Sequence, residues 1–333
     1  MLGPVIHARG LARTFRKKKQ EVHAVVGVDL DVEAGEIVGF LGPNGAGKTT
    51  TLRMLTTLLE PTAGTATVAG CDLITDPVGV RRRIGYVSQS GSTAPEARAG
   101  EEVVDHARLY GMTTAEATER GKRLFSELDL DGPWERQPKT LSGGQRRRLD
   151  IAVGLVHVPE LVFLDEPTTG LDPQARANLW THIQALREER GTTVFLTTHY
   201  LDEADALCDR ILVIDHGLIV ASGTPDELKS QVGGDVLTVT VQRQDQVGEV
   251  ARLVGGLHGA EAPQVVDDRV VGRVRHGGAA LVELVRGLDR ADIAISGIES
   301  RRPSLDDVFL GLTGRSLRDA EPPASAAPEE VAV

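Results

Sequence analysis

Two patterns of apolar residues alternate along the N-terminal part of the chain. Residues 37–41, 160–166 and 192–199 contain short apolar runs, which suit strands buried in a sheet. Within 101–130 and 174–190 the apolar residues recur at three- and four-residue spacing, which predicts amphipathic helices. Helices that alternate with apolar strands indicate an α/β fold with a mostly parallel sheet covered on both faces. Strands are also predicted within residues 5–40 and over 64–70.

The pattern changes after about Thr224. Residues 235–242, 268–276 and 291–298 read as strands, and helices are expected over 246–257, over 279–290 and from Ser304, which suits a helix cap. This β-α-β-(β)-α-β order predicts a small α+β unit. We therefore divide the chain into a domain over 1–228, an accessory or regulatory domain over 229–315, and a disordered tail over 316–333.

Composition narrows the class of protein. Of the 333 residues, 41% are hydrophobic, so the chain can bury a sizeable core, yet no apolar run is long enough for a membrane span. No signal-peptide pattern opens the chain, and the two cysteines, Cys71 and Cys208, are expected as buried thiols in a reducing compartment. A net charge of −11 argues against a nucleic-acid partner, so none is expected. These features favour a cytoplasmic protein.

Chemistry is concentrated first in "GPNGAGKTT", directly after the strand predicted over 37–41. The spacing G-x-x-x-x-G-K-T is that of a phosphate-binding loop, in which glycines let backbone N–H groups curl around phosphate oxygens. A helix that starts near the lysine turns its positive end toward the anion. The alternative is a chance glycine-rich turn, which the strand before and the helix after disfavour. The loop predicts binding of a nucleoside triphosphate with Mg²⁺ through Gly42, Pro43, Asn44, Gly45, Ala46, Gly47, Lys48, Thr49 and Thr50, with Thr49 as a metal ligand.

Two further motifs follow in an order that fits triphosphate hydrolysis. "LSGGQRRR" offers a second helix N-terminus that can hold an anion, built from Ser142, Gly143, Gly144 and Gln145; the alternative is an ordinary capped helix with a solvated arginine face. "ELVFLDEP" is an apolar strand that ends in Asp165, a candidate Mg²⁺ ligand, and Glu166, a candidate general base for the attacking water.

Taken together, the phosphate loop, "LSGGQ", the strand ending in "DE" and "THYLDEAD" resemble the ATP-binding subunit of an ABC transporter over residues 5–228. The resemblance implies a P-loop fold with an antiparallel β subdomain and a helical subdomain at about 92–158. It also implies four further site residues. They are Gln89, which touches Mg²⁺ and water, Asp172 at a dimer seam, His199 as the switch histidine at the γ-phosphate, and Phe15 stacked on adenine.

A narrower resemblance links the chain to drug-export ATPases of the daunorubicin-resistance type, through "PTTGLDPQAR", "SGGQRRRLDIA" and the C-terminal "RRPSLDDVFLGLTGR". In that group the ATPase pairs with a separate integral-membrane permease. One segment, residues 97–103, departs from the family pattern, and the resemblance implies that the membrane partner docks there.

With one phosphate loop and one "SGG" segment per chain, the resemblance implies a head-to-tail homodimer at the cytoplasmic face of the cell membrane, with ATP held between Lys48 of one copy and Ser142 of the other. The expected function is ATP hydrolysis that drives efflux of a drug or other lipophilic compound. Transport of a different substrate, such as a lipid or polysaccharide, remains open. A soluble ABC ATPase or a non-hydrolytic regulator fits less well, because the chain lacks a second nucleotide unit and carries both Glu166 and His199.

Overall fold

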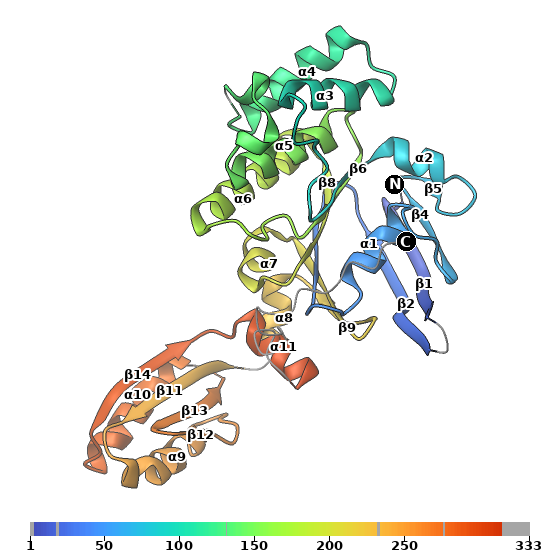
Figure 1. Cartoon of the computed structure of the whole chain (residues 1–333). Helices are drawn as coiled ribbons and strands as arrows, with labels where there is room; N and C mark the ends of the chain where they lie inside the picture. The colour runs from blue at the N-terminus through green and yellow to red at the C-terminus, as the bar shows by residue number, and fades with distance from the viewer. Residues whose placement is uncertain (1–2, 18–19, 131, 232–233, 276, 315–333) are drawn as a thin grey trace. The chain divides into compact units, whose positions relative to one another are not determined.

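The computed structural model describes residues 3–17, 20–130, 132–231, 234–275 and 277–314 (Figure 1). The tail predicted over 316–333 lies outside the described residues. Packing divides the chain into two compact units, with the division between Pro225 and Asp226. The domain boundaries drawn from the sequence stay predictions, although this division falls close to one of them.

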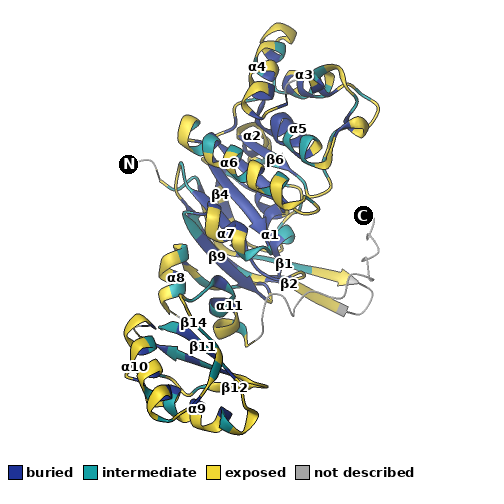
Figure 2. Cartoon of the chain, turned by 90° about the vertical axis from the view of Figure 1, so that its left-hand side faces the viewer, coloured by how far each residue is buried: buried dark blue, intermediate teal, exposed yellow. Residues whose placement is uncertain are grey.

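The first unit is built on a six-stranded sheet in the order β10-β9-β3-β8-β7-β6. Only β10 runs antiparallel to its neighbour; the other pairs are parallel, which confirms the α/β prediction. Every residue of β3, β7 and β8 is buried, so both faces of the sheet are covered (Figure 2). The strands are β3 (Ile37–Leu41), β6 (Ile84–Val87), β7 (Leu161–Asp165), β8 (Thr193–Thr198), β9 (Arg210–Asp215) and β10 (Leu218–Gly223).

Helices connect these strands and pack on the sheet. The ring of Phe195 lies 5.6 Å from both Phe40 and Phe163, and the three buried rings join neighbouring strands. Burial of each such side chain contributes roughly 2–3 kcal/mol. The helices beside the sheet are α1 (Lys48–Leu55), α2 (Pro77–Arg83), α5 (Gly143–Leu155), α6 (Pro173–Arg190) and α7 (Leu201–Leu207).

A second, antiparallel sheet of the first unit has the order β2-β1-β4-β5. Its close packing depends on glycine: a Cβ on Gly64, whose φ is +85°, would lie 2.3 Å from the carbonyl oxygen of Gly10. Its strands are β1 (Ile6–Lys17), β2 (Gln20–Val32), β4 (Ala63–Val68) and β5 (Cys71–Asp72). Cys71 and Cys208 are both buried free thiols, as the sequence predicts.

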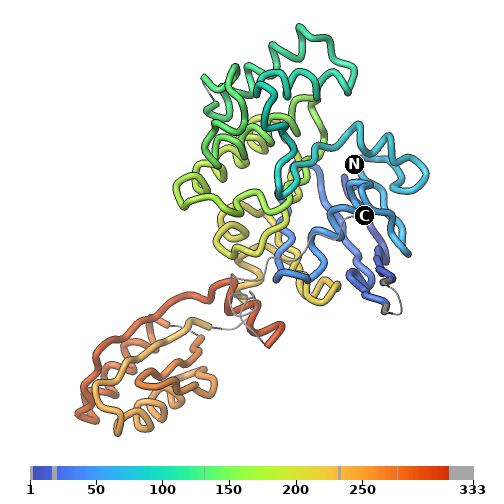
Figure 3. The backbone as a smooth tube through the Cα atoms, viewed as in Figure 1, coloured from blue at the N-terminus to red at the C-terminus, as the bar shows by residue number. Residues whose placement is uncertain are grey.

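A helical subdomain follows β6, after a connection that Figure 3 traces from β6 to α3. It contains α3 (Ala99–Leu109), α4 (Thr114–Glu127), two short 3-10 turns (Pro133–Glu135 and Pro138–Thr140) and the start of α5. Trp134 is the centre of its packing. A Cβ on Gly100 would lie 2.2 Å from the Trp134 ring and one on Gly121 2.8 Å from it, so glycine lets both helices approach the indole.

His157 makes the stability of this unit depend on pH. Its ring stacks on Tyr110 at 3.7 Å, and burial lowers the pKa of His157 to about 4, against the hydrogen bond to the Ile84 carbonyl. Below pH 6.5 the unfolded state binds this proton more readily than the folded state does, so protonation of His157 favours unfolding. The free energy of unfolding is therefore unaffected by His157 above that pH and falls as the pH decreases toward 4. When the pH is lowered from 7.5 to 5.5, the free energy of unfolding of the wild type should decrease by about 1 kcal/mol more than that of His157→Gln, measured by urea denaturation. Parallel pH profiles would contradict this.

The second unit has its own sheet and core. Its four strands pair antiparallel in the order β12-β13-β11-β14, and α9 and α10 bury their apolar faces against one side of the sheet. Ser304 caps the last helix with Asp307 three residues later, as predicted. The elements are α8 (Pro225–Gln231), β11 (Asp235–Val241), a 3-10 turn (Gln244–Gln246), α9 (Val247–Gly255), β12 (Gln264–Val266), β13 (Arg269–Val274), α10 (Gly277–Arg290), β14 (Ile295–Arg301) and α11 (Leu305–Thr313).

Candidate active site

The loop between β3 and α1 has the geometry of a phosphate cradle. Gly45 and Gly47 have φ of +81° and +107°, which other residues rarely adopt. A Cβ on Gly42 would lie 2.3 Å from the Ile214 carbonyl oxygen, so glycine is required for space as well as conformation. The helix starts at Lys48, as the motif predicts, and the Lys48 ammonium donates to the carbonyl oxygens of Gly42 (2.8 Å) and Pro43 (3.2 Å).

The carboxylate of Glu166 is the point at which separate segments converge. Its Oε2 accepts a hydrogen bond from Gln89 Nε2 at 2.8 Å and lies 3.3 Å from His199 Nδ1. Thr169 Oγ1 donates to the same oxygen at 3.1 Å, and Lys48 Nζ lies 3.4 Å from Oε1. Residues predicted from four separate motifs therefore meet at the buried carboxylate of Glu166.

Backbone and charge both mark Glu166 as unusual. It is buried and has a φ of +43°, a strained conformation for a residue with a side chain that is found preferentially at functional sites. Burial alone would raise the pKa of the Glu166 carboxyl, but the His199 hydrogen bond and the Lys48 charge lower it to about 2. Glu166 is thus ionised, the form that a general base requires.

Next to Glu166, oxygen atoms from three segments surround the end of β7. Asp165 Oδ1 accepts hydrogen bonds from Thr197 Oγ1 at 2.6 Å and from Thr49 Oγ1 at 3.2 Å. Burial raises the pKa of Asp165, and the two hydroxyl groups oppose that shift. Hydroxyl, carboxylate and amide oxygens are the ligands that Mg²⁺ prefers, so Thr49, Asp165 and the nearby Gln89 fit the predicted metal.

The "SGGQ" segment forms the first turn of α5. Ser142 Oγ accepts from the Gln145 amide, and Gln145 Oε1 accepts from the Ser142 amide, a reciprocal cap that leaves Gly143 and Gly144 at the helix start. A fully solvated arginine face is wrong for this helix, because Arg147 is 7% exposed. Roles of these four residues in binding ATP stay predictions.

Two of the predicted site residues lie apart from the Glu166 cluster. Asp172 caps α6 by accepting from the Ala175 amide at 2.8 Å. Phe15 is on β1, where its ring is 38% exposed and 4.8 Å from the Arg13 guanidinium. An exposed ring suits stacking on a base better than a role in the core, and both assignments stay predictions.

Sequence reasoning missed two residues that shape this site. Arg147 donates three hydrogen bonds, to the backbone carbonyl oxygens of Ser88, Asp165 and Pro167, but nothing distinguishes it from its neighbours in the run of three arginines. Thr197 bonds Asp165, and its hydroxyl also accepts from the Glu166 amide at 3.0 Å. Its position near the end of a strand, next to a second threonine, is the one signal that points to it.

Comparison with known proteins connects this geometry to a family. The family model described as ABC transporter matches residues 25–169, and the one described as the C-terminal domain of DrrA1-3-like ATP-binding proteins matches 223–313. The daunorubicin/doxorubicin resistance ATP-binding protein of Streptomyces peucetius is 43% identical over 98% of both chains. The chain belongs to the ABC transporter ATP-binding family.

Two other members of this ABC family are informative. The Nod factor export ATP-binding protein I of Cupriavidus metallidurans is 37% identical over 92% of this chain and 98% of its own length. A dimeric ATP-binding cassette bound to ADP and Pi superposes with a TM-score of 0.61 and 26% identity, over 66% of this chain and 98% of that one. The resemblance to drug-resistance ABC ATPases and the prediction of the fold are therefore confirmed. The chain is an ATPase of the ABC family.

No part of the described chain forms a helix with the length and apolar character needed to cross a bilayer.

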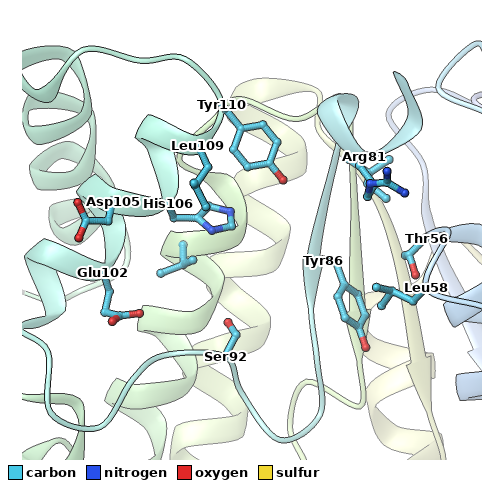
Figure 4. Close-up of a pocket in the computed structure, with 12 residues that line it drawn as sticks. Thr56, Leu58, Arg81, Tyr86, Ser92, Glu102, Asp105, His106, Leu109 and Tyr110 are labelled. Atoms are coloured by element: carbon cyan, nitrogen blue, oxygen red, sulfur yellow. The ribbon is translucent and has the colours of Figure 1, made fainter. Parts of the chain in front are cut away.

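An open groove of about 470 Å³ lies between the helical subdomain and the sheet. Figure 4 shows Glu102, Asp105 and His106 on one side of it, and Arg81 and Tyr86 on the other. Apolar side chains also face this groove, including Leu58 and Leu109, which are 56% and 82% exposed.

Proposed function

We propose that this ABC ATPase energises export of a drug or other lipophilic compound through a separate membrane subunit. The observation that carries the proposal is the convergence of Lys48, Gln89 and His199 on the buried carboxylate of Glu166. This arrangement offers a base, a cation for the terminal phosphate and a switch histidine within one site. The near full-length likeness to a drug-resistance ATP-binding protein supports the substrate class.

The chain's own residues would carry out hydrolysis as follows. Backbone N–H groups of the loop from Gly42 to Thr49 hold the phosphates, and Lys48 adds positive charge at the β- and γ-phosphates. Glu166 accepts the proton of the attacking water while Gln89 orients that water. Mg²⁺ held by Thr49, Gln89 and Asp165 would neutralise charge on the phosphate oxygens.

The proposed working unit is a head-to-tail homodimer. Each ATP would be bound by the phosphate loop of one copy and by Ser142, Gly143 and Gly144 of the other, with Asp172 at the seam. Closure then depends on the γ-phosphate, because both helix N-termini face it. Hydrolysis removes that shared anion and the pair opens, which supplies the mechanical step. A dimeric cassette among the structural relatives supports a dimer.

The groove beside α3 is the proposed docking surface for the membrane subunit, which would keep the ATPase peripheral at the cytoplasmic face of the membrane. It combines exposed apolar residues with Glu102, Asp105 and Arg81, and so fits a short helix that carries apolar side chains and charges of both signs. Ser92 lines the same groove and lies three residues after Gln89. Movement of the bound membrane subunit can therefore shift the loop that carries Gln89.

Transport is tested by reconstituting this chain in vesicles with a candidate membrane subunit that co-purifies with it. ATP-dependent movement of daunorubicin or doxorubicin, with ATPase activity stimulated by the same compound, is the expected result. Movement of a lipid or polysaccharide instead would favour the alternative substrate class. Hydrolysis that no membrane partner or compound alters would contradict a role in transport.

A further inference from the structure

The loop that carries Gln89 is held at both ends by one helix. On its N-terminal side, Arg147 Nη1 donates to the Ser88 carbonyl oxygen at 2.5 Å. On its C-terminal side, Asp150 Oδ1 accepts from the Ser92 amide at 3.1 Å and from the Thr93 hydroxyl at 3.3 Å. Arg147 and Asp150 are three residues apart on α5, so they lie on the same side of the helix.

The fit between this helix and the loop is close. Asp150 is 3% exposed, and a Cβ on Gly91, whose φ is +78°, would lie 2.8 Å from its Oδ2. The loop also closes on itself, since the Gly91 amide donates to the Ser88 carbonyl oxygen at 3.2 Å and Ser88 Oγ donates to that of Gly91 at 2.9 Å. A closed turn that is hydrogen-bonded on both sides, to Arg147 and to Asp150, has little freedom to shift by itself.

Arg147 also reaches the other half of the site. Its Nε donates to the Pro167 carbonyl oxygen at 2.9 Å and its Nη2 to that of Asp165 at 2.9 Å. These two carbonyl groups flank Glu166 in the sequence. One buried guanidinium therefore joins the backbone before Gln89 to the backbone on both sides of Glu166. The side chains of Gln89 and Glu166 are themselves hydrogen-bonded at 2.8 Å.

We infer that Arg147 and Asp150 are positioning residues that hold the Gln89 loop in the register that joins Gln89 to Glu166. Helix α5 begins at the "SGGQ" segment, the proposed contact with the second copy, and its Val153 lines the groove, the proposed contact with the membrane subunit. The same helix therefore connects both proposed contacts to Gln89 and Glu166. The inference rests on the proposed roles of Gln89 and Glu166. Neither Arg147 nor Asp150 is assigned contact with the nucleotide.

The test compares steady-state hydrolysis by the purified full-length chain with Mg²⁺ and ATP. Asp150→Ala should lower kcat about tenfold to a hundredfold, because a small displacement of an active-site group is enough for such a loss. KM for ATP should stay within about threefold, because the phosphate loop is untouched. Arg148→Ala is the matched control: this neighbouring arginine bonds the Asp129 carbonyl oxygen at 3.3 Å instead, and kcat should change by less than about twofold.

A double-mutant cycle separates positioning from a general structural role. If Asp150 acts through Gln89, Asp150→Ala combined with Gln89→Ala should be no slower than Gln89→Ala alone. Asp150→Asn should restore most of the activity, since its amide oxygen can still accept both hydrogen bonds. Should Asp150→Ala not fold, Arg147→Lys, which keeps the charge but cannot reach three carbonyl groups, should lower kcat in its place.

Additive losses in the Asp150 cycle, an unchanged kcat in folded Asp150→Ala or folded Arg147→Lys, or a Gln89→Ala variant as fast as wild type would overturn the inference. Glu166→Gln in the same assay distinguishes failure of the positioning role from failure of the proposed hydrolytic chemistry. If Glu166→Gln is inactive and the cycle is additive, the proposed chemistry stands and only the positioning role fails. If Glu166→Gln is fully active, the proposed chemistry fails first.

Discussion

Glu166→Gln is expected to lower ATP hydrolysis by about 10²- to 10⁴-fold, the usual contribution of a positioned general base. Glutamine keeps the shape of the side chain and can still bond Gln89, Thr169 and His199, but it cannot take a proton from water. Phosphate release under saturating Mg²⁺ and ATP measures the loss. Retained binding of ATP by calorimetry should show that the site is still formed.

Glu188→Gln is the matched control for this substitution. Glu188 is an exposed carboxylate on α6, so its loss changes net charge by the same amount without touching the cluster. The control should hydrolyse ATP at the wild-type rate. A Glu166→Gln variant as active as this control would show that another group takes the proton.

Lys48→Ala should lose binding of ATP, because the substitution removes the one cation that the phosphate loop itself provides. The Lys48 side chain is 5% exposed, and its ammonium bonds the Gly42 and Pro43 carbonyl oxygens, so it also holds the loop in shape. A dissociation constant at least about tenfold weaker is expected, equivalent to the loss of a charge-assisted contact of roughly 1.5–3 kcal/mol.

Calorimetric titration of ATP into Lys48→Ala, with Lys122→Ala as control, measures this effect. Lys122 is exposed on α4, with its ammonium 5.9 Å from the centre of the Trp134 ring, and lies outside the phosphate loop. The control should bind ATP like the wild type. Tight binding by Lys48→Ala would mean that the loop amides alone hold the triphosphate.

Local sequence signals predicted those parts of the molecule that are continuous in the chain. The apolar runs before Gly42 and before Asp165 correspond to β3 and β7, and the glycines of the phosphate loop adopt the left-handed conformations for which the motif selects them. The cap of α11 at Ser304 was likewise visible, because a side chain that accepts from the third residue onward is a local contact.

Contacts between distant segments were not predictable in this way. The Arg147 bonds join α5 to carbonyl groups that precede Gln89 and flank Glu166, and such main-chain partners leave no pattern in the sequence. The groove near α3 is similar, since Arg81 and Asp105 line it from separate helices. Its composition becomes visible only when the two helices are placed in space.

The head-to-tail clamp on ATP is tested most directly by the mass of Glu166→Gln in solution, measured by light scattering after gel filtration. With saturating Mg²⁺ and ATP, the mass should be twice the 35.6 kDa of one chain. With ADP it should be that of a single chain, and Ser142→Arg should prevent dimerisation even with ATP. A monomer under saturating ATP, or a dimer that ignores both the nucleotide and Ser142→Arg, would contradict the account.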